Sequence, residues 1–285
     1  MKTGIQLASY RRDYSTLEET LSVVKAHGYD CLDYNLSDTD DEIFQVSDAE
    51  FEKRLRHEGE LIRASGLMCS QTHGPWRWPV RDFTVEERAE RYASMAKAVR
   101  GTAYVGAPNY VIHCIMPFGA DNTEHRDALW EMNFEYFGRL CEVGKEYGVV
   151  INFENLPFTS LPLSRVCEIL EFVKQMNNPW MKMCLDTGHC AVHGDSVGDA
   201  VRAIGKEYLS ILHVHDNDGR HDNHWLPGQG VIDWSDFSKA LGEIGFEGTV
   251  SLETSVSGDV TVAERLEKQK ALAALTRKIA EGKGL

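Results

Sequence analysis

Short apolar segments recur along the chain, and most of them end in a polar or charged residue. They are rich in Val, Ile, Leu and Cys, the composition of strands that are buried on both faces of a parallel sheet. The pattern predicts eight strands, which are Ile5–Ser9, Cys31–Asn35, Leu67–Thr72, Tyr110–Ile115, Val149–Asn155, Lys182–Asp186, Leu209–His215 and Thr249–Glu253.

The segments between these strands place apolar residues three and four positions apart, which is the spacing of a helix with one buried face. The predicted helices are Leu17–His27, Asp48–Ala64, Thr84–Val105, Glu124–Tyr147, Leu163–Met176, Val197–Ile204, Trp234–Ile244 and Asp259–Ile279. Turn residues support these boundaries, because Gly28, Gly66, Gly148 and Gly245 stand where a helix ends and Asp233 stands where one begins.

Strict alternation of strands and helices predicts parallel strands joined by right-handed crossovers. Eight such units close into a (β/α)8 barrel, so we predict an α/β protein with a single-domain TIM barrel over residues 1–285. The alternative is an open doubly wound sheet. It is disfavoured because no GxGxxG motif follows the first predicted strand.

Composition narrows the range of partners. The formal net charge of -14 repels nucleic acid and anionic lipid, so a nucleic-acid partner is disfavoured. No apolar run is long enough to span a membrane, and the first residues lack the apolar core of a signal peptide. The seven cysteines, without close spacing, suggest free thiols in a reducing compartment. We expect a cytoplasmic protein that binds a small molecule, and a homo-oligomer stays open.

Metal-ligating residue types concentrate at and just after the C-terminal ends of the predicted strands. The candidates are His73, His113, Glu154, Asp186, His189, His213, His215, Asp222, His224 and Glu253. In a TIM barrel these strand ends share the face that carries the active site, so we expect the side chains to converge. His213 and His215 stand two residues apart and therefore point to the same side of their strand.

Each candidate has a simple structural explanation when it is taken alone. A histidine in a strand is usually a hydrogen-bonded core residue, and a lone glutamate can pair with Lys or Arg. The joint pattern is harder to explain in this way, because residues 149–155, 185–189, 209–217 and 250–254 contain no Lys or Arg. Clustered carboxylates without cations require a metal or protons. Imidazole and carboxylate ligands favour Mn²⁺ or Zn²⁺, with Co²⁺, Mg²⁺ and Fe²⁺ as alternatives.

The candidates divide into two sets. One metal on the barrel axis would be held by Glu154, Asp186, Glu253 and either His213 or His215. Further metals would be held by His73, His113, His189, Asp222 and His224. In the loops on the same face, Trp76 and Trp225 are candidates to wall a sugar or a base, and Arg220 is a candidate to hold a substrate phosphate or hydroxyl. A capping aromatic ring and a solvated cation are the simpler interpretations of these three residues.

The strand-end motifs resemble those of the xylose-isomerase-like barrel superfamily, which contains sugar and sugar-phosphate isomerases and epimerases together with endonuclease IV. Phe153-Glu154-Asn155 resembles the family's strand-5 glutamate motif, and Glu253 resembles its strand-8 glutamate. Asp186-Thr187-Gly188-His189 resembles its Asp-x-x-His motif. The resemblance covers nearly the whole chain.

This resemblance implies two alternatives. The endonuclease IV branch uses three zinc ions, and its full ligand pattern is present, including the stretch from Asp222 to Gly230. The epimerase and isomerase branch uses one metal, with Glu154 and Glu253 also transferring the proton and with His215 as the implied strand-7 ligand. The acidic net charge and the acidic loop at residues 38–42 favour the sugar branch, because both repel DNA.

We therefore expect a divalent-metal-dependent sugar or sugar-phosphate isomerase or epimerase. Glu154 and Glu253 would transfer a proton through a metal-stabilised enediolate, and His189 would bind the oxygen that gains charge. One alternative is an endonuclease IV-type zinc phosphodiesterase that acts on abasic DNA. Others are a keto-sugar dehydratase or lyase that uses the same site and a non-enzymatic barrel that binds a sugar or a metal.

Overall fold

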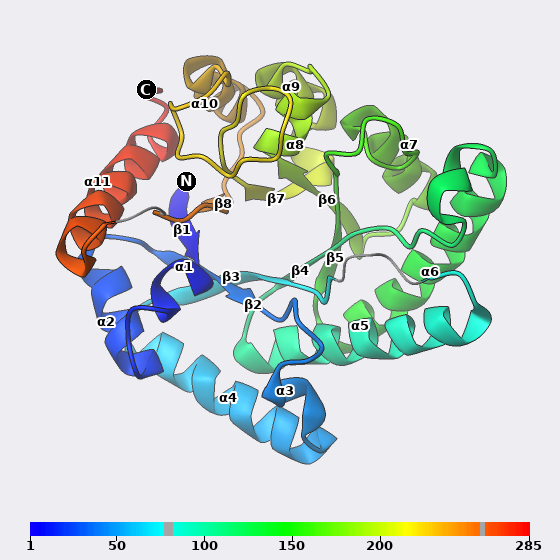
Figure 1. The fold of residues 1–285 in the computed structure, drawn as a ribbon, viewed down its shortest axis with the longest axis horizontal. Coiled ribbons are helices and arrows are strands. Elements are labelled where there is room, and N and C mark those ends of the chain that lie inside the picture. Colours follow the sequence, from blue (N-terminus) through cyan, green and yellow to red (C-terminus); the bar gives the residue numbers. More distant parts are fainter. Residues whose placement is uncertain (77–81, 257–259) are drawn as a thin grey trace.

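A computed structural model describes residues 1–76, 82–256 and 260–285, and eight parallel strands within them form a TIM barrel. The strands are β1 (Lys2–Gln6), β2 (Cys31–Asn35), β3 (Met68–His73), β4 (Asn109–Ile112), β5 (Val150–Glu154), β6 (Met181–Asp186), β7 (Leu209–His213) and β8 (Thr249–Leu252). Their order around the barrel is the order in the sequence, and β8 pairs with β1. The predicted α/β barrel is thereby confirmed (Figure 1).

The barrel closes between β7 and β8, one residue beyond the end of β7. Val214 forms a parallel bridge with Leu252. Its amide donates to the carbonyl of Ser251 at 2.9 Å, and the amide of Glu253 donates to the carbonyl of Val214 at 3.0 Å. These bonds place His213, at the end of β7, beside Glu253.

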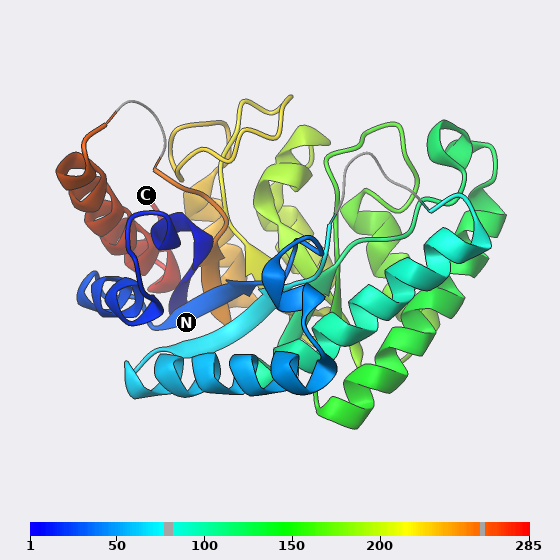
Figure 2. The same cartoon turned by 60° about the horizontal axis from the view of Figure 1, so that its bottom comes forward.

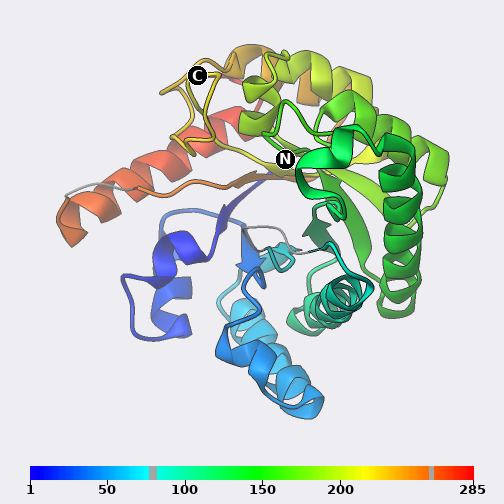
Figure 3. The ribbon, with the colours of Figure 1, turned by 45° about the vertical axis from the view of Figure 1, so that its right-hand side comes forward.

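Helices surround the strands (Figures 1 and 3). The longer ones are α2 (Leu17–Ala26), α4 (Asp48–Ala64), α5 (Val85–Val105), α6 (Arg126–Tyr147), α7 (Val166–Met176), α9 (Val197–Tyr208), α10 (Trp234–Glu243) and α11 (Val262–Ala280). Each corresponds to a predicted helix. The shorter ones are α1 (Ala8–Arg11), α3 (Glu42–Gln45), the 3-10 helix η1 (Gly119–Thr123) and α8 (Thr187–Val192). They were not predicted, because a helix of one or two turns is too short to show a period.

Several predicted boundaries are wrong. β1 begins and ends three residues earlier than predicted, because the amides of Tyr10 and Arg11 bond to the carbonyl of Leu7 and turn the chain into α1. β4 ends at Ile112 and β7 at His213, so His113 and His215 lie beyond their strands. Asp259, the predicted start of the last helix, lies outside the described residues.

The predicted turn residues behave as expected. Gly28, Gly66, Gly148 and Gly245 all have positive φ, the conformation that ends a helix at lowest cost when the residue is glycine. The Asp233 side chain accepts a hydrogen bond from the amide of Asp236 at 2.9 Å and caps α10. Within the described part of the chain, no helix is both long and apolar enough to cross a membrane.

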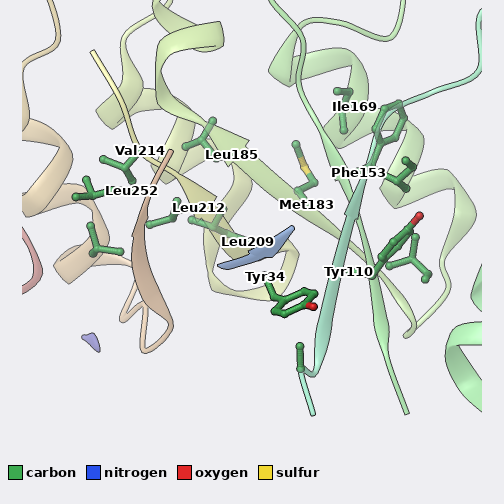
Figure 4. Close-up of a cluster of buried hydrophobic side chains, with 14 of the residues drawn as sticks. Tyr34, Tyr110, Phe153, Ile169, Met183, Leu185, Leu209, Leu212, Val214 and Leu252 are labelled. Carbon is green, nitrogen blue, oxygen red and sulfur yellow. The ribbon is translucent and has the colours of Figure 1, made fainter. Parts of the chain in front are cut away.

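The core has two parts because strand side chains alternate between two faces. Tyr110 and Ile112 pack in the large cluster between strands and helices, and Val111, which lies between them, packs with Cys184 and Ile211 in a separate small cluster. Figure 4 shows part of the large cluster around Phe153 and Leu212. Burying one such large side chain stabilises the fold by about 1.5–3 kcal/mol. All seven cysteines are free, as expected.

Candidate functional site

A pocket of about 750 Å³ opens at the C-terminal ends of the strands. Figure 2 shows the connections that follow β5 and β7, green and yellow, on this side of the ribbon. The residues that line the pocket lie at or just after the ends of all eight strands, from Gln6 at the end of β1 to Glu253 after β8. They are Gln6, Asn35, Ser37, Asp38, His73, Trp76, His113, Glu154, Leu156, Pro157, Phe158, His189, Asp222, His224 and Glu253. The convergence predicted from the fold is therefore present.

Glu154 is the centre of the deepest group of side chains. It ends β5 and is only 1% exposed. Its Oε1 lies 2.7 Å from Nδ1 of His213. Its Oε2 lies 2.9 Å from Nε2 of His113 and 3.4 Å from Nε2 of His73. We call His73, His113, Glu154, His213 and Glu253 the inner cluster.

His213 joins the inner cluster to β2. Its Nδ1 also lies 2.9 Å from Oε2 of Glu253, and its Nε2 lies 3.0 Å from Oδ2 of Asp33. The amide of the Gln71 side chain donates to the same Asp33 oxygen at 3.1 Å. The amide of the Gln6 side chain donates to Oε1 of Glu253 at 2.8 Å. The His213 ring is thus held in one orientation by carboxylates on both sides, and the carboxylates of Asp33 and Glu253 are themselves held by Gln71 and Gln6.

A second group lies nearer the pocket mouth. Asp222 Oδ2 is 3.2 Å from Nε2 of His189 and 3.2 Å from Nε2 of His224, and Asp222 Oδ1 is 3.6 Å from Nε2 of His215. The rings of His215 and His224 stack with 4.0 Å between their centroids. We call His189, His215, Asp222 and His224 the outer cluster.

Asp186 lies between the two clusters. It ends β6, and its Oδ1 caps α8 by accepting a hydrogen bond from the amide of His189 at 2.6 Å. Its Oδ2 lies 3.0 Å from Nε2 of His215. A Cβ atom at Gly188 would lie 1.9 Å from the His215 ring, so this position must be glycine for the ring to reach Asp186. The Asp-Thr-Gly-His motif therefore shapes the site in addition to supplying ligands.

The inner cluster is strongly coupled electrostatically. Burial acts to raise the pKa of Glu154, but the neighbouring His213 and the hydrogen bond from His113 hold it well below its usual value. Burial acts in the same way on Glu253, and His213 again lowers the pKa of this carboxyl. Burial lowers the pKa of His113 to about 4, so this ring is neutral and able to bind a metal.

In the outer cluster, ion pairing outweighs burial. Burial acts to lower the pKa of His189, but Asp186 and Asp222 raise it to about 10. Burial likewise opposes the charge on His224, whose pKa Asp222 and Glu253 raise to about 9. The two histidines in turn hold the pKa of Asp222 below its usual value. Without a metal, protons on these rings balance the carboxylates.

The donor set fits divalent metal ions. Among the described residues, five overlapping groups have ligand atoms within 4.8 Å of one another, and three of them consist of the predicted ligands that make up the two clusters and Asp186: His73, His113 and Glu154; Glu154, Asp186, His213 and Glu253; and His189, His215, Asp222 and His224. The other two are His73, His213 and Glu253, and Glu154 and His213 with the buried thiol of Cys184. None of the pocket-lining residues that the structure describes is Lys or Arg. Nδ1 of His113 is buried without a hydrogen-bond partner. Nitrogen and oxygen donors without cations are the set that Zn²⁺ and Mn²⁺ prefer.

All ten candidate ligands from the sequence lie in or between the two clusters. Although they stand two residues apart, His213 and His215 belong to different clusters, because β7 ends at His213. Trp76 lines the pocket, whereas Trp225 and Arg220 are not among its lining residues. The roles predicted for these residues stay predictions.

Sequence reasoning missed two residues that contact the inner cluster. Asp33 lies in the predicted strand Cys31–Asn35 and is 1% exposed, and Gln6 ends β1. The signal for Asp33 was present, because an acidic residue inside an apolar strand needs a partner. Its partner, His213, is 180 residues away in the sequence.

The comparisons with known proteins identify sugar epimerases as relatives. D-psicose 3-epimerase of Ruminiclostridium cellulolyticum is 30% identical over 157 residues, which are 55% of this chain and 52% of that protein. The chain thus spans about half the length of this relative. D-psicose 3-epimerase of Agrobacterium fabrum is 23% identical over 276 residues, covering 94% of this chain and 89% of that protein.

Solved structures agree on the fold. The structure of the IOLI protein with a bound zinc atom superposes with a TM-score of 0.77 at 20% identity, covering 99% of this chain and 98% of that one. The model of the family described as xylose isomerase-like TIM barrels matches residues 21–279, and the chain therefore belongs to this family.

Proposed function

We propose that this protein is a divalent-metal-dependent sugar epimerase or isomerase that moves a proton at a carbon next to a carbonyl. The observation that carries this proposal is the pair Glu154 and Glu253. Their carboxylates lie 2.7 Å and 2.9 Å from the same nitrogen of His213, at the floor of the pocket. Two carboxylates that flank one position are what inversion at carbon requires, because a proton leaves one face and returns on the other.

The metal ligands that we propose are Glu154, Asp186, His213 and Glu253. We favour His213 over His215, because His213 lies beside both glutamates whereas His215 lies beside Asp186 and Asp222. A bound divalent cation would supply Lewis-acid stabilisation of the enediolate that forms when the proton leaves. Mn²⁺ or Zn²⁺ suits this donor set. His189, Asp222 and His224 would hold a further ion.

The protonation states support proton transfer. The pKa values of Glu154 and Glu253 both lie below their usual range, so both side chains are ionised at neutral pH and either can accept a proton from carbon. To return a proton to the opposite face, the other carboxylate must first take one up from solvent. His189 lines the pocket and has a pKa of about 10 in the metal-free site, so it carries a proton while the outer cluster holds no ion. In that state it can donate a hydrogen bond to a substrate oxygen that gains negative charge, whereas with an ion bound in the outer cluster it is one of the ligands.

The pocket lining favours a sugar without a phosphate group. Among the lining residues that the structure describes there is no Lys or Arg, and Asp38 and Asp222 add negative charge. A phosphate dianion would be repelled there. Trp76 and Phe158 supply apolar surface for the C–H face of a sugar ring.

Proton exchange tests the proposal directly. Metal-loaded protein would be incubated in D₂O with ketohexoses, with keto-sugars and with their phosphates, and proton NMR would follow the deuterium content and the products. We expect deuterium at the carbon that changes configuration, with the unphosphorylated sugars preferred. Loss of water from the sugar would assign the dehydratase or lyase alternative. No exchange into any of these sugars by metal-loaded protein would refute the proposal.

The outer cluster favours a second candidate, a metal-dependent phosphodiesterase that cuts abasic DNA. Its four ligand-bearing residues are additional to the ligands that a single metal needs. Sites with several metals stabilise both the attacking and the leaving oxygen of a phosphoryl displacement. The same metal-loaded protein would therefore be assayed on an abasic duplex. Metal-dependent nicking without sugar exchange would replace the first proposal by this one.

A further inference from the structure

Asp216 carries a buried carboxylate that the proposed proton transfer does not use. It follows the outer-cluster residue His215 and is 0% exposed. Five N–H groups donate to its two oxygens at 2.9–3.3 Å: the amides of Asn217, Gly228, Gly230 and Ile232 and the indole Nε1 of Trp234. All five partners are neutral. Such a set of converging N–H dipoles fixes the position of the carboxylate.

These bonds fasten the long loop between β7 and α10, yellow in Figure 2, at its base. Asp216 and Trp225 form an antiparallel bridge, with mutual backbone hydrogen bonds of 2.9 Å and 2.8 Å. The returning arm then packs directly on the Asp216 side chain. A Cβ atom at Gly230 would lie 2.4 Å from Oδ1 of Asp216 and 2.0 Å from the carbonyl oxygen of Asn217. Glycine is therefore required where the arm crosses the carboxylate.

The tip of this loop carries two residues of the outer cluster. Asp222 and His224 lie between the bridged residues Asp216 and Trp225. His224 has a φ of 50°, which is uncommon for a residue with a side chain, and its Nδ1 lies 2.7 Å from the carbonyl of Glu253. Such a conformation persists when the surrounding structure enforces it. The closed base of the loop is the structure that can do so.

We propose that Asp216 is a positioning residue for the outer metal site. Its carboxylate accepts hydrogen bonds from the amides of Gly228 and Gly230 in the Gly228-Gln229-Gly230 motif and so holds Asp222 and His224 beside His189. The two glycines of this motif thus supply amide donors that close the loop at its base. This inference rests on the proposed function only in so far as the outer cluster binds a metal ion.

The test separates the two clusters by counting metals. Metal-stripped protein would be titrated with Co²⁺, followed by calorimetry and by the visible absorption of the bound ion. The difference between wild type and His224→Ala defines the ions that belong to the outer cluster. Asp216→Asn presents an N–H group where two of the amides need an acceptor. We expect it to weaken binding of these ions by about 10–100-fold and to leave the other ions unchanged.

Asp218→Asn is the matched control. Asp218 lies in the same loop, and its carboxylate accepts hydrogen bonds from the amides of Arg220 and His221 and contacts Nδ1 of His221 at 2.8 Å, all before the chain turns back towards Asp216. We expect this variant to bind metal as wild type does. Equal metal binding by Asp216→Asn and Asp218→Asn would overturn the inference. So would equal binding by wild type and His224→Ala, an outcome that leaves the sugar proposal standing on the inner cluster.

A milder variant covers the case in which Asp216→Asn does not fold. Trp234→Phe removes one donor, Nε1 at 2.9 Å, and keeps an aromatic ring in the core. We expect a smaller loss of outer-site affinity, of a few-fold, in a protein that unfolds at close to the wild-type temperature. An unchanged outer-site affinity in this variant would count against Asp216 as the positioning group. Sugar exchange measured on the same samples reports separately on the proposed function.

Discussion

Nε2 of His213 lies 3.0 Å from Oδ2 of Asp33, on the side of the ring opposite to Glu154 and Glu253. A carboxylate at this place accepts a hydrogen bond from Nε2–H, which keeps the proton on Nε2 and leaves Nδ1 free to bind a metal. It also raises the basicity of the ring as a ligand. The link joins β2 to β7 across the barrel.

We expect Asp33→Asn to weaken binding of the inner metal by about 10–100-fold, because an amide cannot hold the ring in one tautomer as a carboxylate does. The measurement is calorimetric titration of metal-stripped protein. Asp30→Asn, at the start of the same strand and at the opposite end of the barrel, is the control and should bind metal as wild type does. Equal affinities in the two variants would show that Asp33 does not orient His213.

Removing either of the two proposed proton-transfer groups, Glu154 or Glu253, should lower turnover and change which epimer exchanges its proton. We expect Glu154→Gln and Glu253→Gln each to lower kcat for epimerisation by about 10²–10⁴-fold at saturating metal. Each variant retains one carboxylate, so deuterium exchange should persist for one epimer and stop for the other. Glu243→Gln, which removes an exposed carboxylate that pairs with Arg202, is the control. Wild-type turnover in both active-site variants would sink the mechanism.

The outer cluster should make the metal-free protein sensitive to alkali. The pKa of His189 is raised to about 10 and that of His224 to about 9, both above the value of about 6.5 in an unfolded chain. Their stabilisation is therefore complete below pH 6.5 and is lost as the pH rises towards 10. We expect the free energy of unfolding to fall by an amount on the order of a few kcal/mol between pH 7 and 10, mostly from the buried His189, since one pKa unit corresponds to about 1.4 kcal/mol and solvent screens the partly exposed His224.

Chemical denaturation in the presence of a chelator, at a series of pH values, measures this loss. In the His189→Gln variant, the free energy of unfolding should depend less on pH, because the variant has no proton to lose at this position. Wild type and variant with the same pH profile would contradict the expectation. Metal-loaded wild type should also lack the loss, because a bound ion replaces the ring protons.

The two tryptophans predicted to bind substrate differ in position. Trp76 lines the pocket and packs edge-on against His113, with 4.5 Å between ring centroids, whereas Trp225 is 38% exposed and does not line the pocket. We expect Trp76→Ala to raise KM for the sugar by about tenfold, the loss of roughly 1–2 kcal/mol of aromatic contact. Trp225→Ala should leave KM within a factor of two. A larger rise in KM for Trp225→Ala than for Trp76→Ala would place the sugar outside the pocket described above.

Much of the barrel could be predicted because its information is local. The apolar runs of the strands and the helical spacing between them repeat eight times, and Asp233 and Gly148 mark element ends by their own backbone preferences. The errors lie where local signals are weak. The predicted strand Ile5–Ser9 runs too far because the segment is apolar, whereas the backbone from Leu7 to Arg11 bonds to itself and forms α1.

The sequence also showed His, Asp and Glu residues at the predicted strand ends. It did not show which of these residues lie together in one cluster. His213 and His215 are two residues apart, yet one contacts Asp33, Glu154 and Glu253 and the other contacts Asp186. The strand ends between them, so the alternation of a strand no longer decides where the second ring lies.

The sequence by itself therefore determined the order of the strands and longer helices, the class of fold and the set of candidate ligand residues, because each depends on composition and spacing within a short segment. Only the tertiary structure decided which ligands share a cluster, that Asp33 supports His213 and that Asp216 closes the loop over β7. These contacts join residues brought together by barrel closure and by a loop that returns on itself. Their geometry depends on the whole fold, and no local pattern of residues encodes it.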